Sequence, residues 1–573
     1  MKILTLIIFC FSLFFRIYQL DSIPAGLYWE EVALGYDALS IAETGADHHG
    51  NSWPIVAFES FGDWKPSLYF YVLVPFVKIL GLNAWAVRLP AAISGLLIAA
   101  GTGFLIYLLF HQRLNPAVAK KLALLGYLLA SVNPWLIQFS RAGWEITLAT
   151  ALIVWAVVFW LLGLERAKRK GAQTQKNVGW LVLSALLLAL SMYTQHSARL
   201  AAPLIGLLLV IWSSLQFGFK NFIQELPHVK LFKGWLFSVI IAALFAFLLV
   251  LPLLIRFGSS EITQRFAETS IFSDIEIIER SNEYRQLSDN SLISRIIYHR
   301  YVLFGSEILR NMFSHLTLDF LFLSGDSNPR HSTGFFGLFY HLDLVLLSFG
   351  LVYLLKHHRS VLKLLGGWIL ISLLPASIAT GAPHALRILP GISAWLIVAT
   401  LGVYYLFLIL RQFKFKHLLF NSILLGFFGF YMLETIWFWR FYTAVYPKLA
   451  AQHWQYGYEE MVETAEKLRS ENPQLPIYIT REQGRPAMYY WFYTQTNPRL
   501  VQLAAPTVVK DQGEFLQWQN ISFIDRVDQV ESDGQFILAS SPRFAQQLSR
   551  TAQSELDSVE DPLGETFWQV GVY

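Results

Sequence analysis

Long apolar segments alternate with short polar ones along most of this 573-residue chain. A helix needs about 20 apolar residues, at about 1.5 Å each, to cross the hydrocarbon of a bilayer. Eleven segments approach this pattern: residues 3–19, 89–110, 122–139, 146–164, 178–194, 200–217, 234–255, 338–355, 364–380, 388–410 and 417–437. The pattern predicts an α-helical polytopic membrane protein with about eleven transmembrane helices.

The composition agrees with this class. Hydrophobic residues make up 55% of the chain, charged residues make up 15%, and the mean hydropathy is +0.44. These values exclude an ordinary soluble protein of several domains. The net charge of +4 comes from short basic loops between the apolar segments, so it does not indicate nucleic-acid binding.

The first apolar segment could be mistaken for a secretory signal. Arg16 interrupts it and no small-x-small cleavage site follows, so we expect an uncleaved membrane anchor. The same segment holds Cys10, the only cysteine. A single cysteine excludes an intramolecular disulfide and a multi-cysteine metal site.

Basic residues predict the orientation of the chain, because lysine and arginine beside a span stay in the cytoplasm. With a cytoplasmic N-terminus, five short basic loops all lie inside the cell. They contain Arg113, Lys120, Lys121, Arg166, Lys168, Arg169, Lys170, Lys176, Lys220, Lys230, Lys233, Lys356, Arg359, Lys363, Arg411, Lys414 and Lys416. The chain is then a multi-pass protein of the cell membrane, with loops 20–88 and 256–337 and its C-terminal region outside the cytoplasm.

The C-terminal region differs from the rest in its pattern. After Tyr446 it predicts a helix at 458–470, a strand at 477–479, a helix at 486–492, and strands near 521–524, 536–538 and 566–573. We therefore expect a transmembrane domain at residues 1–445 and a small extracytoplasmic mixed α/β domain at residues 446–573. Within residues 1–445, loop 256–337 alternates charged and apolar positions and predicts surface helices.

The first predicted loop, residues 20–88, is polar and rich in acids. Glu30 and Glu31 follow the first span, and Lys65 precedes Pro66 at a predicted helix start. Further acids are interleaved with aromatic residues that suit a membrane interface; they are Asp37, Glu43, Asp47, Glu59 and Asp63. A solvated acidic surface is one interpretation. A carboxylate that acts as a general base is the other.

Four further polar patches fall on the same predicted side, and each contains an arginine: Arg141 with Glu145, Arg199 beside His196, Arg330 beside His331, and Arg387 beside His384. One such arginine is commonly a headgroup anchor. Several together can bind a phosphate, because guanidinium groups match its oxygens with paired hydrogen bonds.

A divalent metal site is a further alternative, with ligands drawn from Asp47, His48, His49, His331 and His384. Their spacing fits no standard set of ligands. No metal ligands are assigned from the sequence, and no cofactor is predicted beyond the option of a divalent metal.

The motifs of the first loop, in this order after one span, resemble the phospholipid-carrier-dependent glycosyltransferases. This GT-C group includes the protein O-mannosyltransferases and the aminoarabinose transferase of lipid A, and the chain resembles its bacterial branch over residues 10–445. The motifs are Phe15-Arg16-Ile17, Pro24-Ala25-Gly26, Glu30-Glu31, Gly35-Tyr36-Asp37-Ala38, Thr44-Gly45, Lys65-Pro66 with Leu68-Tyr69, and Val87-Arg88-Leu89-Pro90. Later matches are Asn133-Pro134-Trp135, Ser140-Arg141, His196-Ser197-Ala198-Arg199, Ser324-Gly325-Asp326, Arg330-His331-Ser332 and Pro383-His384-Ala385-Leu386-Arg387.

The resemblance implies transfer of a sugar, with inversion, from a polyprenyl-phosphate donor such as undecaprenyl or dolichyl phosphate to an acceptor on the outer face. The acceptor is a protein, a glycan or a lipid. The family has an aspartate, its proposed catalytic base, where this chain has Glu30. The extra methylene moves the carboxylate by about an ångström. Either the backbone compensates and Glu30 is the base, or the base is Glu31 or Asp37, or activity is reduced.

The chemistry of such a transfer assigns the remaining candidates. A departing phosphate gains negative charge in the transition state, so a nearby cation stabilises it. Lys65 is the first candidate for a donor phosphate ligand, followed by Arg199, Arg330 and Arg387. Other polar residues are candidates for substrate binding: Asp37, Asp47, His49, Asp63, Tyr69, His196, His331 and His384.

Two other functions are compatible with the pattern. A flippase or transporter would move lipid-linked sugars without breaking a bond, but transporters place polar groups at the midplane, whereas the clusters here lie at one predicted face. A sensor or scaffold would use the C-terminal domain to bind carbohydrate or peptide.

Overall fold

The computed structural model describes residues 2–60, 62–170, 175–216, 226–412, 417–531, 534–548, 552–553 and 556–573. These residues form two compact units. Unit 1 comprises Met1–Arg16, Ile93–Ser140 and Glu145–Phe438, and unit 2 comprises Ile17–Ala92, Arg141–Trp144 and Trp439–Tyr573. Parts of three loops predicted to be cytoplasmic, residues 171–174, 217–225 and 413–416, lie outside the described residues.

Every predicted span coincides with a helix, which confirms the helical membrane architecture. Seven described segments are long and apolar enough to cross a bilayer: Ala84–Phe110, Glu145–Ala167, His196–Gln216, Trp235–Ile255, Arg359–Ser377, Ala385–Gln412 and Asn421–Ala444. An eighth is the bent pair Pro116–Val132 and Pro134–Ser140. The other three predicted spans match shorter apolar helices, α1 (Lys2–Ile17), α8 (Gln175–Met192) and α15 (His341–His357).

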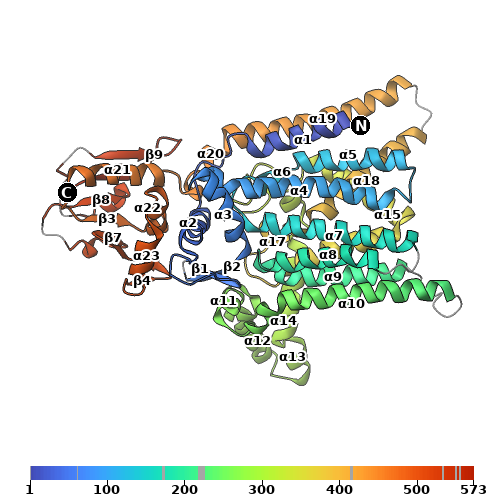
Figure 1. The fold of residues 1–573 in the computed structure, drawn as a ribbon, viewed down its shortest axis with the longest axis horizontal. Coiled ribbons are helices and arrows are strands. Elements are labelled where there is room, and N and C mark those ends of the chain that lie inside the picture. The colour runs from blue at the N-terminus through green and yellow to red at the C-terminus, as the bar shows by residue number, and fades with distance from the viewer. Residues whose placement is uncertain are drawn as a thin grey trace. The chain divides into compact units, whose positions relative to one another are not determined.

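Long helices make up most of unit 1. They are α4 (Ala84–Phe110), α5 (Pro116–Val132), α6 (Pro134–Ser140), α7 (Glu145–Lys170), α9 (His196–Gln216), α10 (Leu226–Ile255), α16 (Arg359–Ser377), α18 (Ile392–Gln412) and α19 (His417–Ala444). Helix α8 lies between α7, α9 and α10, and α15 packs on α18 (Figure 1). All backbone hydrogen bonds of a helix are internal, which suits segments surrounded by lipid.

A 60° bend separates α5 from α6. Pro134 has no N–H to continue α5, and the Asn133 side chain accepts a hydrogen bond from the Leu136 N–H at 3.0 Å, which starts the new helix. The bend therefore follows directly from the Asn133-Pro134 pair.

Loop 256–337 forms short helices, as predicted. They are α11 (Ser260–Thr269), η2 (Ile271–Ser273), α12 (Ile275–Leu287), α13 (Leu292–Ile297), α14 (Arg300–Ser314) and η3 (Asp319–Leu323). Helix α14 packs on α16, and Ile271, Ile277 and Phe304 form a small core. After α16, the short elements α17 (Ala385–Ile388) and η4 (Leu389–Gly391) lead into α18.

Unit 2 contains the first loop and the C-terminal region. The first loop forms α2 (Trp29–Thr44), a hairpin of β1 (Ala57–Ser60) and β2 (Asp63–Pro66), and α3 (Leu68–Leu80). Helices α22 (Pro486–Tyr493) and α23 (Pro498–Ala504) pack on α2. A hydrogen bond of 2.9 Å from the Trp29 N–H to Gln455 Oε1 also joins the loop to the C-terminal region.

A mixed six-stranded sheet forms the core of the C-terminal region, with strand order β6-β7-β3-β8-β10-β9. Strand β3 pairs in parallel with β7 and β8, and β10 pairs antiparallel with β8 and β9. The strands are β3 (Ile477–Thr480), β6 (Gln517–Trp518), β7 (Ile521–Ile524), β8 (Ile537–Ser540), β9 (Asp557–Glu560) and β10 (Thr566–Val572). The remaining elements are α20 (Tyr446–Leu449), η5 (Gln452–Trp454), α21 (Tyr458–Glu471), β4 (Lys510–Asp511), β5 (Glu514–Phe515), η6 (Val527–Gln529) and α24 (Pro542–Ala545).

This sheet confirms the predicted mixed α/β character, and β3, β7, β8, β10, α21 and α22 lie where the pattern predicts them. Strands β6 and β9 are missing from the prediction because short edge strands leave little alternation in the sequence. The proposed domain boundary at residue 445 stays a prediction.

Candidate active site

The two glutamates at the start of α2 have different surroundings. The Glu31 side chain is 1% exposed, whereas the Glu30 side chain is 29% exposed. Adjacent positions on a helix point in directions about 100° apart. One carboxylate therefore lies inside unit 2 and the other lies near its surface.

Each oxygen of the Glu31 carboxylate accepts two hydrogen bonds. Oε1 accepts from Arg88 Nε at 2.9 Å and from the Gly143 N–H at 2.8 Å. Oε2 accepts from the Tyr28 N–H at 3.1 Å and from Arg88 Nη2 at 3.2 Å. Glu31 thus caps the N-terminus of α2 and neutralises a buried arginine.

Arg88 is the central residue of this network. Its Nη1 donates to the Leu20 and Pro24 carbonyls, each at 3.0 Å, and its Nη2 also donates to the Gly26 carbonyl. Arg88 connects the chain before α2 to the start of α4. Arg88 stands in one of the family motifs but is not among the site residues predicted from the sequence, although an arginine beside an apolar segment is a signal for a functional position.

Glu30 forms an ion pair with Lys65. The Lys65 Nζ lies against Glu30 Oε2, and the lysine side chain is only 7% exposed. Lys65 is held on β2 opposite Phe58 of β1, and α3 starts three residues later. The structure therefore brings together the two residues that the sequence proposes as base and phosphate ligand.

Asp37 lies two turns after Glu30 on α2. Its Oδ1 accepts hydrogen bonds from the His48 backbone N–H at 3.0 Å and from His48 Nδ1 at 2.7 Å. Burial alone would lower the pKa of His48, but attraction to Asp37 and this hydrogen bond raise it. Asp37 and His48 thus form a buried ion pair when the imidazole is protonated.

Asp47 and His49 flank this pair. Asp47 accepts hydrogen bonds from the His49 and Asn51 backbone and from the Asn51 side chain, which closes a turn. Burial, and then the charge of Asp37, raise the pKa of Asp47. Burial, His48 and Lys510 lower the pKa of His49, whose Nδ1 lies 3.0 Å from Lys510 Nζ.

The other two candidates of the first loop have mainly local contacts. Asp63 accepts a hydrogen bond from the Trp64 N–H at 2.8 Å and is half-buried. Tyr69 is buried, and its hydroxyl donates to the Val87 carbonyl at 3.4 Å. These contacts support the loop, and a substrate-binding role for either residue stays a prediction.

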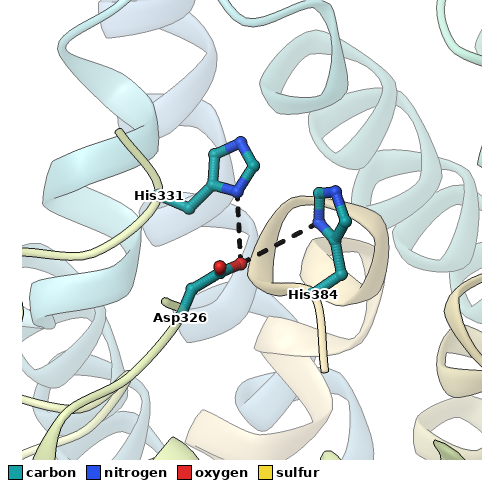
Figure 2. Close-up of side chains that lie close together, drawn as sticks. All are labelled: Asp326, His331 and His384. Carbon is teal, nitrogen blue, oxygen red and sulfur yellow. Dashed lines mark hydrogen bonds and ion pairs between the residues drawn. The ribbon is translucent and has the colours of Figure 1, made fainter. Parts of the chain in front are cut away.

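Unit 1 holds a second group of candidates. The His331 Nδ1 lies 3.2 Å from Asp326 Oδ2, and the His384 Nδ1 lies 3.9 Å from the same oxygen (Figure 2). Burial alone would raise the pKa of Asp326, but the hydrogen bond and charge of His331, the Asn328 N–H and the charge of His384 together lower that pKa. Burial, followed by His331 and Arg387, lowers the pKa of His384. Asp326 is missing from the residues proposed from the sequence, although it stands in one of the quoted motifs.

The candidate arginines of unit 1 are half-buried. Arg330 Nε lies 3.3 Å from Asn328 Oδ1, and its carbonyl accepts from Gln138 Nε2 at 2.7 Å. Arg387 Nη1 donates to the Thr380 carbonyl at 2.9 Å. Arg199 Nη1 lies 3.4 Å from His196 Nδ1 at the start of α9. Their role as phosphate ligands stays a prediction.

No protein-family model and no curated protein matches the chain. Among solved structures, it is similar to ArnT from Cupriavidus metallidurans in the apo state, with a TM-score of 0.50 and 13% identity over 100% of this chain and 96% of that chain. ArnT from the same organism bound to undecaprenyl phosphate has a TM-score of 0.48 and 13% identity, over 99% of this chain and 97% of that chain. The chain is also similar to the oligosaccharyltransferase AglB from Archaeoglobus fulgidus in complex with an inhibitory peptide and a dolichol-phosphate. That match has a TM-score of 0.49 and 14% identity, over 86% of this chain and 63% of that chain. The chain therefore has the GT-C fold of ArnT, as the motifs of its first loop predict.

Proposed function

We propose that this protein is an inverting glycosyltransferase that moves a sugar from a polyprenyl-phosphate donor to an acceptor hydroxyl. The observation that carries this proposal is the ion pair of a half-exposed Glu30 with a buried Lys65. A carboxylate beside an ammonium group stays ionised at neutral pH, and an ionised carboxylate can accept a proton. ArnT, whose fold this chain shares, has been solved bound to undecaprenyl phosphate, which is a polyprenyl phosphate like the carrier of the proposed donor.

Glu30 is the proposed base, and Glu31 is a supporting residue. The carboxylate of Glu31 is occupied by Arg88 and by the backbone of Tyr28 and Gly143. A base must reach the proton that it removes, and Glu31 is only 1% exposed. Glu30, with 29% of its side chain exposed, meets this condition.

Lys65 has two roles in this mechanism. Its ammonium group has three donors, so it can hold the Glu30 carboxylate and still bind a phosphate oxygen. As the bond between the sugar and the phosphate breaks, the phosphate goes from one negative charge towards two, and the lysine stabilises the second charge. The acceptor proton passes to Glu30 as the acceptor oxygen bonds to the sugar.

The site is proposed to face the extracytoplasmic side of the cell membrane. The short basic loops between the predicted spans support this orientation, because lysine and arginine beside a span stay in the cytoplasm. Cysteine labelling tests it in whole cells: on a Cys10→Ser background, a cysteine at exposed Glu43 should react with a membrane-impermeant maleimide, and one at Arg359 should not. Reversed labelling would contradict the orientation.

The reaction is tested with purified protein, lipid-linked sugars extracted from the cell membrane, and a membrane or envelope fraction that supplies the acceptor hydroxyl. The parent should release free polyprenyl phosphate, and Glu30→Gln and Lys65→Met should each lower the rate by about 100-fold or more. Glu43→Gln, on the exposed last turn of α2, and Lys78→Met, on the exposed last turn of α3, are matched controls. If the folded Glu30→Gln and Lys65→Met variants transferred sugar at the rate of the parent, the proposal would be overturned. Translocation of intact lipid-linked sugar without release of free polyprenyl phosphate would favour a flippase.

A further inference from the structure

Three side chains converge in unit 1 from two loops that are far apart in the sequence. Asp326 and His331 come from the loop between η3 and α15, and His384 precedes α17. The ligand atoms of the three residues all lie within 4.8 Å of one another. Figure 2 shows both imidazole rings directing a nitrogen toward the Asp326 carboxylate.

Hydrogen bonding explains only part of this arrangement. The 3.2 Å separation of His331 Nδ1 from Asp326 Oδ2 is a hydrogen bond, but the 3.9 Å separation of His384 Nδ1 from the same oxygen is too long for one. His384 Nδ1 is buried and has no hydrogen-bond partner among the described residues. A buried polar atom of this kind needs an explanation, and a bound ion supplies one.

The separations suit a small tetrahedral ion. Zinc bonds to imidazole nitrogen and carboxylate oxygen at about 2.0–2.2 Å, so two ligands of a tetrahedral site lie about 3.3–3.6 Å apart. The His331 Nδ1 is 3.2 Å from Asp326 Oδ2, just below this range, and the His384 Nδ1 is 3.9 Å from the same oxygen, just above it. Two imidazoles and one carboxylate are a common set of zinc ligands.

The surrounding backbone holds the ligands in place. The Ala385 N–H donates to Asp326 Oδ2 at 2.7 Å, and the His384 N–H donates to His315 Nε2 at 3.0 Å. His315 Nδ1 donates in turn to the Asn311 carbonyl at 2.6 Å. Such outer contacts fix the orientation of metal ligands.

Gly325 lets the loop that carries Asp326 close tightly. Its φ is +79°, in the left-handed region that favours glycine, and a Cβ there would clash with Ser332 Oγ. Ser332 Oγ donates across the same loop to the Ser324 and Phe336 carbonyls. The loop is therefore built to place Asp326 and His331 side by side.

We propose that Asp326, His331 and His384 bind one divalent transition-metal ion of the zinc class, through Asp326 Oδ2 and the Nδ1 atoms of both histidines. A water molecule completes the coordination. The ion joins the loop before α15 to the loop before α17 and stabilises unit 1. This inference does not depend on the proposed reaction.

The test uses full-length protein in detergent, stripped with a chelator and then titrated with Co²⁺. We expect one equivalent to bind with the visible absorption of a four-coordinate site, and Zn²⁺ to displace it. His331→Ala and His384→Ala should each weaken binding by at least about 10- to 100-fold, the loss that outer contacts alone can cause. His453→Ala, an exposed histidine in unit 2, should bind as the parent does.

X-ray absorption at the zinc edge of the parent protein gives a readout that needs no variant. Two imidazole nitrogens with oxygen ligands would support the site. Failure of the parent to bind one equivalent of Co²⁺, or unchanged affinity in folded His331→Ala and His384→Ala, would overturn it. A zinc spectrum with no imidazole would overturn it as well.

Discussion

Arg88 and Glu31 form a buried, two-point ion pair, with Nε 2.9 Å from Oε1 and Nη2 3.2 Å from Oε2. Removing one partner leaves the other charge buried and uncompensated, which costs about 3–5 kcal/mol. We therefore expect Glu31→Gln and Arg88→Met each to lower the free energy of unfolding of unit 2 by about this amount. Denaturant unfolding in detergent, followed by tryptophan fluorescence, measures the change.

The exposed pair of Arg280 and Glu276 is the control for this prediction. Glu276 is 78% exposed, so Glu276→Gln should change stability by less than about 1 kcal/mol. In the double variant Glu31→Gln/Arg88→Met, the loss should be smaller than the sum of the single losses. Additive losses would show that the two residues are not coupled.

Glu30→Asp should keep part of the transfer activity. The shorter side chain withdraws the carboxylate by about 1 Å, and a misplacement of that size can lower the rate by about 100-fold. We expect kcat to lie between those of the parent and Glu30→Ala in single-turnover assays of phosphate release. An activity equal to that of Glu30→Ala would mean that the exact position of the carboxylate is essential.

Lys65 should affect the chemical step more than donor binding. Its charge acts on a phosphate that becomes more negative as the sugar leaves, so the interaction is stronger in the transition state. Lys65→Met should lower kcat by about 100- to 1,000-fold with a smaller change in KM. Lys65→Arg should restore part of kcat, and a change confined to KM would contradict this role.

His48 and His49 should change the pH dependence of stability in opposite directions. The pKa of His48 is raised on folding, so its stabilising contribution is present below its unfolded pKa of about 6.5 and is lost as the pH rises through the folded value. The pKa of His49 is lowered, so its neutral form favours the folded state above about pH 6.5, and this contribution is lost as the pH falls.

Thermal unfolding from pH 5 to pH 8, about the range in which histidine titrates, tests both signs. Relative to the parent, His48→Gln should lose the most stability at the acid end. His49→Gln should lose the least there. The same trend in both variants would contradict the opposite environments of these neighbours.

Gln455 should stabilise the start of α2 from the C-terminal region. Its Oε1 accepts hydrogen bonds from the Trp29 N–H at 2.9 Å and from the Tyr489 hydroxyl at 2.8 Å. Gln455→Ala leaves both donors without this acceptor, which should cost about 1–3 kcal/mol. Gln452→Ala, at an exposed position three residues earlier, should have little effect in the same unfolding assay.

The sequence by itself determined the helices and most of the strands. Each apolar segment satisfies its backbone hydrogen bonds within itself, so length and hydropathy are sufficient to locate it. The strands at 477–480 and 521–524 could be located because alternation and turn residues are local signals. Glu30 and Lys65 could be proposed together because a carboxylate and an ammonium group lie in the same polar loop after the first predicted span.

Only the tertiary structure decided the roles of neighbouring residues. Glu30 and Glu31 have the same chemistry, and the burial of Glu31 against Arg88, 57 positions away, distinguishes them. Asp326 joins His331 and His384 because two loops 59 positions apart meet at the Ala385 N–H. Such partners depend on how helices pack, and packing combines many small contacts between residues that are distant in the sequence.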